Sequence, residues 1–232
     1  MLTLKAISLI CTVLCATYAY PNIDKRQVPI GTSISQCLPG QVAITFDDGP
    51  SNFTHPLLDT LSSFGARSTF FVVGSMIEEN SSALLRAYRE GHQIGLHTWS
   101  HANLNHLTEA SIHDEMTKVS DAVAGVIGVR PRFVRCPYGS CDERVLRILG
   151  DMGYKIVNWN LDTDDWRTLS PDHTIKAYEN ALTDKNEGFI SLQHDIYETT
   201  ISAVPRIIQT IRLRGFETNT VADCLNDNHA YF

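Results

Sequence analysis

The sequence lacks an apolar run long enough to cross a bilayer, which takes about 20 residues. Its one long apolar stretch, residues 6–16, is shorter; it follows Lys5 and precedes Thr17 and Ala19, small residues at the cleavage positions. This order is typical of a secretory signal peptide, which we expect over residues 1–19. The sequence therefore predicts a secreted protein, outside the cell or in the cell wall, with no membrane contact once the signal is removed.

An excess of basic residues is also missing, since the formal net charge is −7. Nucleic acids and anionic membranes attract basic surfaces, so neither is expected as the main partner. Repeats, low-complexity tracts and Pro/Gly-rich linkers are absent beyond the leader. The 232 residues, 43% of them hydrophobic, suffice for one sizeable core. We expect one domain over residues 27–232, present as a monomer.

Export implies further processing and modification. Lys25 and Arg26 resemble a dibasic processing site, which predicts a short propeptide over residues 20–26. Asn52 and Asn80 each begin an Asn-x-Ser/Thr acceptor sequence, so we expect both to be glycosylated.

The paired CxxC spacing of a four-cysteine zinc site is absent, which argues against such a site. Of six cysteines, Cys11 and Cys15 leave with the signal peptide. An even number remains on an oxidising route, so disulfides are expected; these residues are Cys37, Cys136, Cys141 and Cys224. Of the three connectivities, we favour the one in which Cys136 and Cys141 bridge a tight loop and the other two join the chain ends.

Strand-like and helix-like segments alternate along the rest of the chain. Short apolar runs predict seven strands, over residues 42–46, 69–73, 92–96, 133–135, 155–159, 189–192 and 216–218. Helical patterns lie between nearly all of them, around residues 56–61, 81–89, 108–124, 143–150, 175–182 and 204–214. This alternation predicts an α/β protein with parallel strands. The pattern alone fits a barrel and an open doubly wound sheet equally.

The hexapeptide at residues 45–50 ends the first of these strands with two carboxylates, Asp47 and Asp48. Adjacent negative charges repel, so the pair calls for a cation or a proton. An Asx turn, in which one of the two caps backbone amides, explains the hexapeptide alone equally well. The polar residues at the ends of later strands favour a functional site over an Asx turn alone.

Polar residues follow five of the strands at the edge where parallel α/β folds carry their chemistry. Besides the two aspartates, these segments are residues 97–101, 135–138, 162–166 and 193–195. His97 and His101 are four apart, so one helical turn would place both imidazoles on one side. With one aspartate they would form a two-histidine, one-carboxylate metal site.

The remaining histidines and the tryptophans have weaker signals. Six histidines have no matching set of candidate ligands, and we expect them to be surface or packing residues: His55, His92, His106, His113, His173 and His229. Arg135 would be aimed into the site by the rigid Pro-Tyr-Gly turn that follows, although a structural ion pair explains it too. Trp166 is expected in a pocket wall and Trp159 in the core, and Trp99 is left undecided.

The five ordered segments resemble the motifs of the polysaccharide deacetylases, the carbohydrate esterase family with the NodB-homology domain, which includes chitin deacetylases and acetylxylan esterases. The resemblance covers residues 41–225 and is nearest to secreted fungal chitin deacetylases, including the tail at residues 221–225. Cys136 and Gln193 depart from the usual pattern without removing a catalytic group. The family fold implies a distorted (β/α) barrel of about seven parallel strands, which agrees with the count above.

The resemblance also implies roles for individual residues. Asp48, His97 and His101 would hold one divalent metal, most simply Zn²⁺ with Co²⁺ as a substitute. Asp47 would be the general base oriented by Arg135, and His194 the general acid kept charged by Asp165. The backbone N–H of Tyr138 would stabilise the oxyanion, Trp166 and Leu192 would shape the acetate pocket, and Asp162 and Asp195 would support loops.

The implied reaction is metal-dependent hydrolysis of N-acetyl groups on chitin or its oligosaccharides, with acetate as a product. Within the family, acetylxylan esterase and peptidoglycan deacetylase are the alternatives. A non-heme iron oxygenase shares the two-histidine, one-carboxylate signature but needs neither a second acidic residue nor an acid such as His194. A non-catalytic glycan-binding protein needs neither Asp47 nor His194, so both rivals carry less weight.

Overall fold

The structure is a computed structural model that describes residues 28–232. The signal peptide and propeptide predicted before Gln27 lie outside the described residues. The strands are β1 (Ser33–Ile34), β2 (Gln41–Ala43), β3 (Thr45–Asp47), β4 (Thr69–Val72), β5 (Gln93–Leu96), β6 (Phe133–Val134), β7 (Lys155–Val157), β8 (Leu161–Asp162), β9 (Phe189–Leu192) and β10 (Glu217–Asn219). The α-helices are α1 (Thr54–Ser63), α2 (Ile77–Arg89), α3 (Glu109–Ile127), α4 (Glu143–Asp151), α5 (Asp165–Thr168), α6 (Pro171–Ala181), α7 (Glu198–Leu213) and α8 (Val221–Cys224).

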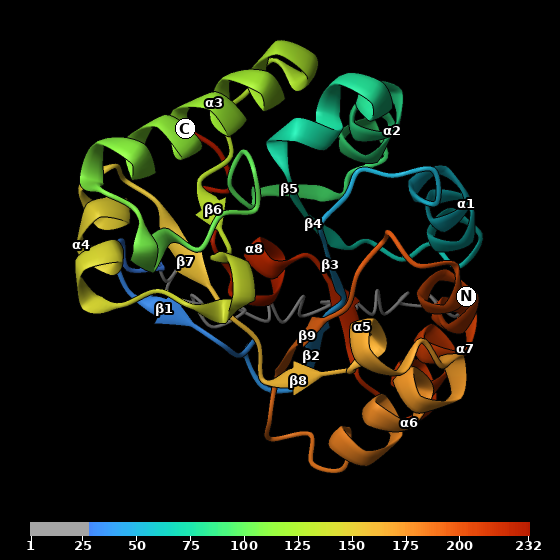
Figure 1. The fold of residues 1–232 in the computed structure, drawn as a ribbon. Coiled ribbons are helices and arrows are strands. Elements are labelled where there is room, and N and C mark those ends of the chain that lie inside the picture. The colour runs from blue at the N-terminus through green and yellow to red at the C-terminus, as the bar shows by residue number, and fades with distance from the viewer. Residues whose placement is uncertain (1–27) are drawn as a thin grey trace, which may run out of the picture.

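All ladders between the named strands are parallel, and they curl into a barrel that is open on one side (Figure 1). Six strands follow the order β1-β7-β6-β5-β4-β3, and four follow β10-β2-β9-β8. A parallel bridge between Asp47 and His194 joins β3 to the end of β9 and so links the two sheets. Among residues 28–232 no ladder connects β7 or β1 to β8, so the barrel stays open between them.

The predicted α/β class and barrel-like parallel sheet are confirmed, and so are all seven predicted strands. The first of them is interrupted at Ile44 into β2 and β3. Two strands, β1 and β8, were not predicted, because two residues are too few to show a period. The assignment of residues 162–166 to the end of the fifth strand is wrong, since Asp162 is the last residue of β8, which pairs with β9, and residues 163–166 follow it.

Six predicted helices are present, and local chemistry explains where several of them begin. Thr108 caps α3 by accepting a hydrogen bond from Ser111 N, and Asp142 caps α4 in the same way. The predicted start of the last long helix at residue 204 is wrong, because α7 begins at Glu198 and contains Pro205. The first turn of α7 is rich in polar residues, so the apolar period is visible only later.

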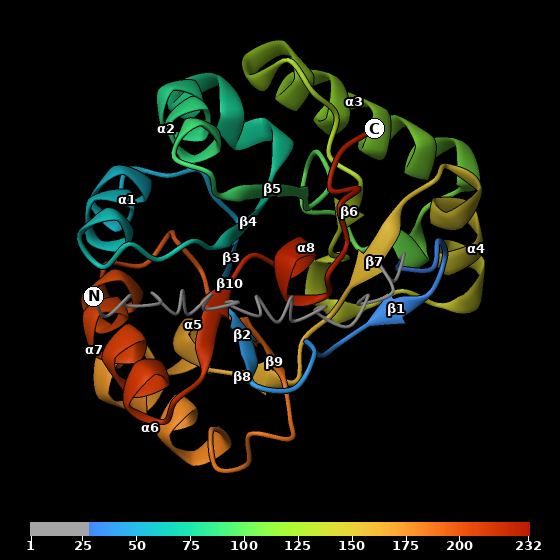
Figure 2. The ribbon, with the colours of Figure 1, turned by 180° about the vertical axis from the view of Figure 1, so that it is seen from behind.

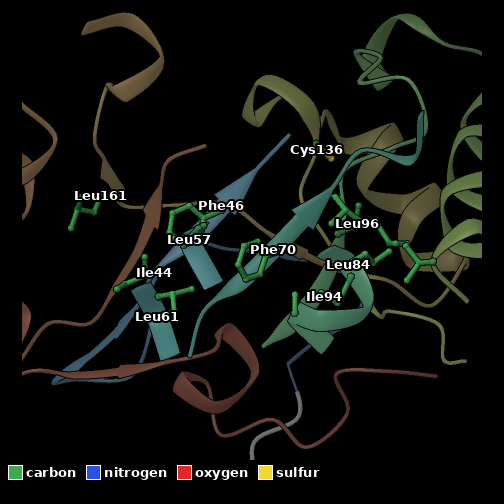
Figure 3. Packing of buried hydrophobic residues seen from close by; sticks show 14 of the residues in the cluster. Ile44, Phe46, Leu57, Leu61, Phe70, Leu84, Ile94, Leu96, Cys136 and Leu161 are labelled. Atoms are coloured by element: carbon green, nitrogen blue, oxygen red, sulfur yellow. The ribbon is translucent and has the colours of Figure 1, made fainter. Parts of the chain in front are cut away.

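Alternation along the strands sorts the core into two layers. Side chains such as Ile44, Phe46, Phe70 and Ile94 face the surrounding helices, and Figure 3 shows Leu57 of α1 near Phe46 and Leu61 of α1 near Ile44. The intervening residues fill the barrel itself with a smaller apolar cluster that includes Ala43, Phe71, Phe133, Val157 and Ile190. Burying one such aliphatic or aromatic side chain contributes about 1.5–3 kcal/mol, so these two layers hold the sheet in its curl.

The short helix α8 covers the barrel at the amino ends of its strands (Figure 2). The backbone N–H of Val221 donates to Thr69 Oγ1, and that of Ala222 donates to Gln93 Oε1. Thr69 and Gln93 are the first residues of β4 and β5, so α8 closes the end opposite to the carboxyl edge. Nowhere in the described part of the chain is there a helix with the length and apolar character that a membrane crossing needs.

Within residues 28–232 the structure contains two disulfides, and both match the favoured pairing. Cys37 is bonded to Cys224 of α8, which ties the start of the described chain to its end. Cys136 is bonded to Cys141 across a loop at the carboxyl edge.

Replacing Cys37 and Cys224 by Ala is expected to lower the free energy of unfolding by about 5 kcal/mol in the chain-entropy model, because the bond closes nearly the whole domain. The matched control replaces Cys136 and Cys141, whose short loop gives only about 2 kcal/mol in the same model. Thermal unfolding of both variants measures the difference. Equal destabilisation would contradict this account, and peptide mapping without reductant checks the pairing directly.

Candidate active site

Two carboxylates stand at the carboxyl end of β3. Asp47 is buried, whereas Asp48 is partly buried and has a φ of 72°, in the left-handed region. That conformation breaks the alternation of a strand, so both side chains line the same cavity. Asp195 stabilises the turn that follows Asp48. Its carboxylate lies against Gly49 and accepts a hydrogen bond from Thr54 Oγ1 at 2.5 Å. Burial raises the pKa of Asp195 to about 7.

The two histidines come from the loop after β5. The structure places Thr98 and His101 in the left-handed region, at φ of 65° and 58°, and the segment is not helical. The helical turn predicted from the spacing of His97 and His101 is therefore wrong, although their ring centroids do lie 5.0 Å apart. Spacing could not reveal this loop, because threonine and histidine rarely adopt that conformation. Glu115 supports it by accepting hydrogen bonds from the backbone of residues 99 and 100 at 2.9 Å each.

Asp48, His97 and His101 bring three ligand atoms within 4.8 Å of one another. Asp48 Oδ1 lies 3.5 Å from His97 Nε2 and 3.3 Å from His101 Nε2. Two ligands of a tetrahedral ion with bonds of 2.0–2.1 Å are about 3.3 Å apart, so the separations suit such an ion. Asp48 Oδ1 is also buried and has no hydrogen-bond partner among the described residues.

The protonation of His97 fits the same purpose. Its Nδ1 lies 2.7 Å from the carbonyl oxygen of Arg135 and donates to it, which leaves the lone pair of Nε2 free. Burial lowers the pKa of His97 and so favours the neutral ring, the form that binds metals. The donor set therefore fits a divalent cation.

Asp47 forms a buried ion pair with Arg135. Arg135 Nη1 donates to Asp47 Oδ1 at 2.8 Å and to Thr45 Oγ1 at 2.6 Å, and its Nη2 donates to the carbonyl of Asn158. The guanidinium also lies over the ring of Phe71, with its carbon 4.3 Å from the ring centroid. These contacts fix the carboxylate, and breaking such a buried pair costs about 3–5 kcal/mol. The ion-pair reading of Arg135 is confirmed, whereas the guanidinium is fully buried and is not among the cavity-lining residues, so its role in the reaction stays a prediction.

His194 also lines the cavity, and a parallel bridge pairs its backbone with Asp47. Its Nδ1 lies 2.9 Å from Asp165 Oδ1, and its backbone N–H donates to Asp165 Oδ2. Thr200 of α7, which the sequence did not single out, also donates to Asp165 Oδ2, at 2.7 Å. Burial lowers the pKa of His194, but the hydrogen bond and charge of Asp165 outweigh it and raise the pKa to about 9.

The side chains enclose a cavity of ≈ 410 Å³ at the carboxyl edge of the barrel. Leu192 is buried in its wall, whereas Trp166 and Tyr138 lie exposed at its rim, 50% and 68% accessible. Four other residues line it: Cys136, Trp159, Asp162 and Tyr197. Cys136 and Asp162 belong to segments expected at this edge but had no expected role in the cavity, and Tyr197 was not singled out. Trp159 was expected in a strand core, but β7 ends at Val157 and its ring reaches the cavity.

The loop that carries Tyr138 is held close to the metal ligands. Tyr138 has a φ of 62°, and its ring packs edge-on against His101 with centroids 4.7 Å apart. The disulfide between Cys136 and Cys141 closes this loop. The loop therefore holds the Tyr138 ring against one of the three candidate ligands.

Residues outside the cavity follow the expectations in part. The predicted packing role of His92 is confirmed, since it is buried, accepts a hydrogen bond from Ser68 N and packs edge-on against Phe70. Trp99, left undecided, is partly buried against Gly74 and is not among the cavity residues. Asn52 is exposed. Asn80 is partly buried and donates to the carbonyl of Met76, and glycosylation at either site stays a prediction.

Residues 38–157 match the family described as polysaccharide deacetylase. The chain is 39% identical over 224 residues to a chitin deacetylase of Colletotrichum lindemuthianum, with 91% of this chain and 90% of the relative covered. The chain belongs to the polysaccharide deacetylase family. A second relative, a chitin deacetylase of Pestalotiopsis sp, is 40% identical, with 90% of this polysaccharide deacetylase and 72% of the relative covered.

Solved structures of the family share the fold. The chitin deacetylase structure from Colletotrichum lindemuthianum matches this polysaccharide deacetylase with a TM-score of 0.86 at 37% identity, covering 88% of this chain and 97% of the other. A peptidoglycan deacetylase from Bacillus subtilis matches with a TM-score of 0.73 at 30% identity, covering 82% and 90%. The predicted membership in this family is thus confirmed over most of the chain.

Proposed function

We propose that this polysaccharide deacetylase is a secreted chitin deacetylase, which hydrolyses N-acetyl groups on N-acetylglucosamine units of chitin or its oligosaccharides and releases acetate. The observation that carries the proposal is that an Asp47–Arg135 pair and an Asp165–His194 pair both lie beside the three clustered metal-ligand atoms: Asp47 Oδ2 is 3.8 Å from His97 Nε2, and His194 Nε2 is 3.9 Å from Asp48 Oδ2. The two chitin deacetylases that cover most of the chain favour chitin as substrate.

Asp48, His97 and His101 would hold one divalent cation, and we propose Zn²⁺ with Co²⁺ as a functional substitute. When bound, such an ion acidifies its water ligand and polarises the acetyl carbonyl. Binding is helped by the buried Asp48 Oδ1, which otherwise lacks a partner among the described residues.

Asp47 is the proposed general base. Arg135 Nη1 donates to Oδ1, so Asp47 Oδ2, 3.8 Å from His97 Nε2, is the oxygen left to accept the proton of the attacking water. Because three donors of Arg135 are engaged by Thr45, Asp47 and Asn158, the carboxylate cannot rotate freely. A fixed base saves the cost of ordering it during the reaction.

His194 is the proposed general acid. Its Nδ1 is engaged by Asp165, so Nε2, which faces the cavity 3.9 Å from Asp48 Oδ2, can donate a proton to the leaving nitrogen. A pKa of about 9 keeps the ring protonated at neutral pH. The backbone N–H of Tyr138 would stabilise the negative charge on the carbonyl oxygen, while Leu192 and Trp166 would enclose the acetyl group.

The test is mass spectrometry of the products from four substrates: N-acetylglucosamine oligomers, polymeric chitin, acetylated xylan and peptidoglycan. Loss of acetyl groups from the chitin substrates with the highest kcat/KM is the expected result. Preferential release from acetylated xylan or peptidoglycan would assign the chain to that branch of the family. No release from any of them, with the metal bound, would favour a non-catalytic glycan-binding protein.

Export and domain organisation belong to the same proposal. We propose that the mature enzyme is a single domain over residues 27–232 that acts outside the cell or in its wall. Two disulfides support an oxidising location. Amino-terminal sequencing of the secreted protein tests whether it begins at Gln27.

A further inference from the structure

Trp159 lies at the open side of the barrel, in the three residues that separate β7 from β8. The segment changes partners here: Asn158 N donates to Ile34 O beside β7, whereas Asn160 N donates to Ile190 O of β9. Figure 1 shows β7 and β8 as separate arrows on either side of this change. The indole therefore lies at the side of the barrel where, in the described part of the chain, no strand ladder joins β7 to β8.

The indole contacts three separate parts of the site. The guanidinium carbon of Arg135 lies 5.5 Å from the centroid of the Trp159 ring and 4.3 Å from the centroid of the Phe71 ring. The six-membered ring of the indole packs on Gly139. A Cβ atom added to this glycine would lie only 2.7 Å from Trp159 Cη2, so the contact requires glycine. Its Nε1 donates to Asp162 Oδ2 at 3.2 Å.

Each residue that the indole contacts is connected to a different part of the proposed catalytic machinery. Arg135 orients Asp47, Gly139 follows Tyr138 in the disulfide-closed loop, and Asp162 precedes the short helix that begins with Asp165. Asp162 Oδ1 also accepts the backbone N–H of Asp164, so the indole is connected to the entry of that helix.

We propose that Trp159 is a positioning residue for the reaction: it holds the Asp47–Arg135 pair, the Tyr138 loop and the Asp162 segment in register across the open side of the barrel. It also lines the cavity, so its ring separates the buried guanidinium from solvent in that cavity. The inference rests on the proposed function for its kinetic readout, but the arrangement it describes is a property of the fold.

The kinetic test compares three variants on N-acetylglucosamine oligomers. Trp159→Leu is expected to lower kcat roughly 10- to 100-fold, the scale that small displacements of catalytic groups cost, with KM changed less than about twofold. Trp159→Phe keeps an aromatic face over Arg135 and should recover most of that loss. The matched control Trp166→Leu removes a cavity wall that is not among the contacts of Arg135, so its main effect should be a higher KM. A raised KM at unchanged kcat in Trp159→Leu would overturn the proposal.

A double-mutant cycle tests whether Trp159 acts through Arg135. If it does, Trp159→Leu should cost much less in an Arg135→Lys background than in the wild type. If the losses of kcat in the two single variants simply multiplied in the double variant, the two residues would act independently and the proposal would be contradicted. Bound metal and thermal unfolding of each variant exclude a loss of fold.

A measurement that needs no catalytic turnover distinguishes a failure of the positioning role of Trp159 from a failure of the proposed deacetylase function. Hydrogen exchange of the Arg135 guanidinium, followed by NMR, should be slow in the wild type and faster in Trp159→Leu, because the ring no longer covers the group. Unchanged exchange would overturn the positioning role even in an active enzyme. A wild type that is inactive on every glycan would instead refute the proposed function.

Discussion

Asp47→Asn is expected to lower kcat roughly 10²- to 10⁴-fold, the usual contribution of a general base, while leaving metal affinity nearly unchanged. The amide can still accept a hydrogen bond from Arg135, which now meets Asp47 Oδ1 at 2.8 Å, so the geometry should survive. What it cannot do is accept the proton of the attacking water.

Asp48→Asn is the matched variant, because it changes the adjacent carboxylate by the same atoms. Here the metal should be lost: Asp48 Oδ1 lies 3.5 and 3.3 Å from the two histidine nitrogens and is the one anionic atom of the set. Removing an outer partner of a metal ligand already costs 10- to 100-fold in affinity, so changing the ligand itself should cost more. Competition with a chelating dye measures affinity, and acetate release measures kcat. If both variants kept metal and rate, the assignment of base and ligand would be wrong.

Asp165→Asn is expected to move the alkaline limb of the kcat/KM profile to lower pH, besides lowering the rate. The pKa of His194 stands at about 9 because the hydrogen bond and charge of Asp165 exceed the opposing effect of burial. An acid works only while protonated, so activity falls as the pH rises through this pKa. Without the carboxylate charge, burial dominates, the pKa falls, and the loss of activity begins at lower pH.

His194→Ala separates the acid from other roles through the leaving group. Amide nitrogen must be protonated to depart, whereas an aryl oxygen leaves as an anion. The variant should therefore slow hydrolysis of N-acetylglucosamine oligomers far more than hydrolysis of an aryl acetate. The pH profiles of both variants on both substrates give the answer. An alkaline limb that stays in place in Asp165→Asn, together with equal losses on ester and amide, would show that His194 is not the acid.

The sequence was informative wherever apolar runs were long enough to show a period. Strands such as β4 and β9 are visible as four-residue apolar runs, and the polar residues that follow each strand mark the edge of the site. Parallel topology then brings those residues together, which pointed to His97 and His101 with one of the two aspartates. The choice of Asp48 as the third ligand came from the family resemblance, and the three ligand atoms do cluster. The disulfide pairing followed from the short distance in sequence between Cys136 and Cys141.

The remaining features depend on tertiary contacts that leave no local pattern. The strand predicted over residues 155–159 stops at Val157, because the chain then leaves β1: Asn160 N donates to Ile190 O of β9. Thr200 reaches Asp165 from a helix 35 positions away, and a lone threonine gives no signal. Asp48, His101 and Tyr138 have left-handed backbone conformations, which few non-glycine residues adopt and which no local pattern marks. The surrounding structure fixes these conformations.

The most direct test of a metal-dependent deacetylase is acetate release from N-acetylglucosamine oligomers by the wild-type protein before chelation, after removal of bound metal, and after addition of one equivalent of Zn²⁺. The account predicts loss of activity in the chelated protein, recovery on Zn²⁺ addition, and no recovery in His97→Ala, whose Nε2 lies 3.5 Å from Asp48 Oδ1. Full activity in chelator, with no metal detected in the protein, would contradict it.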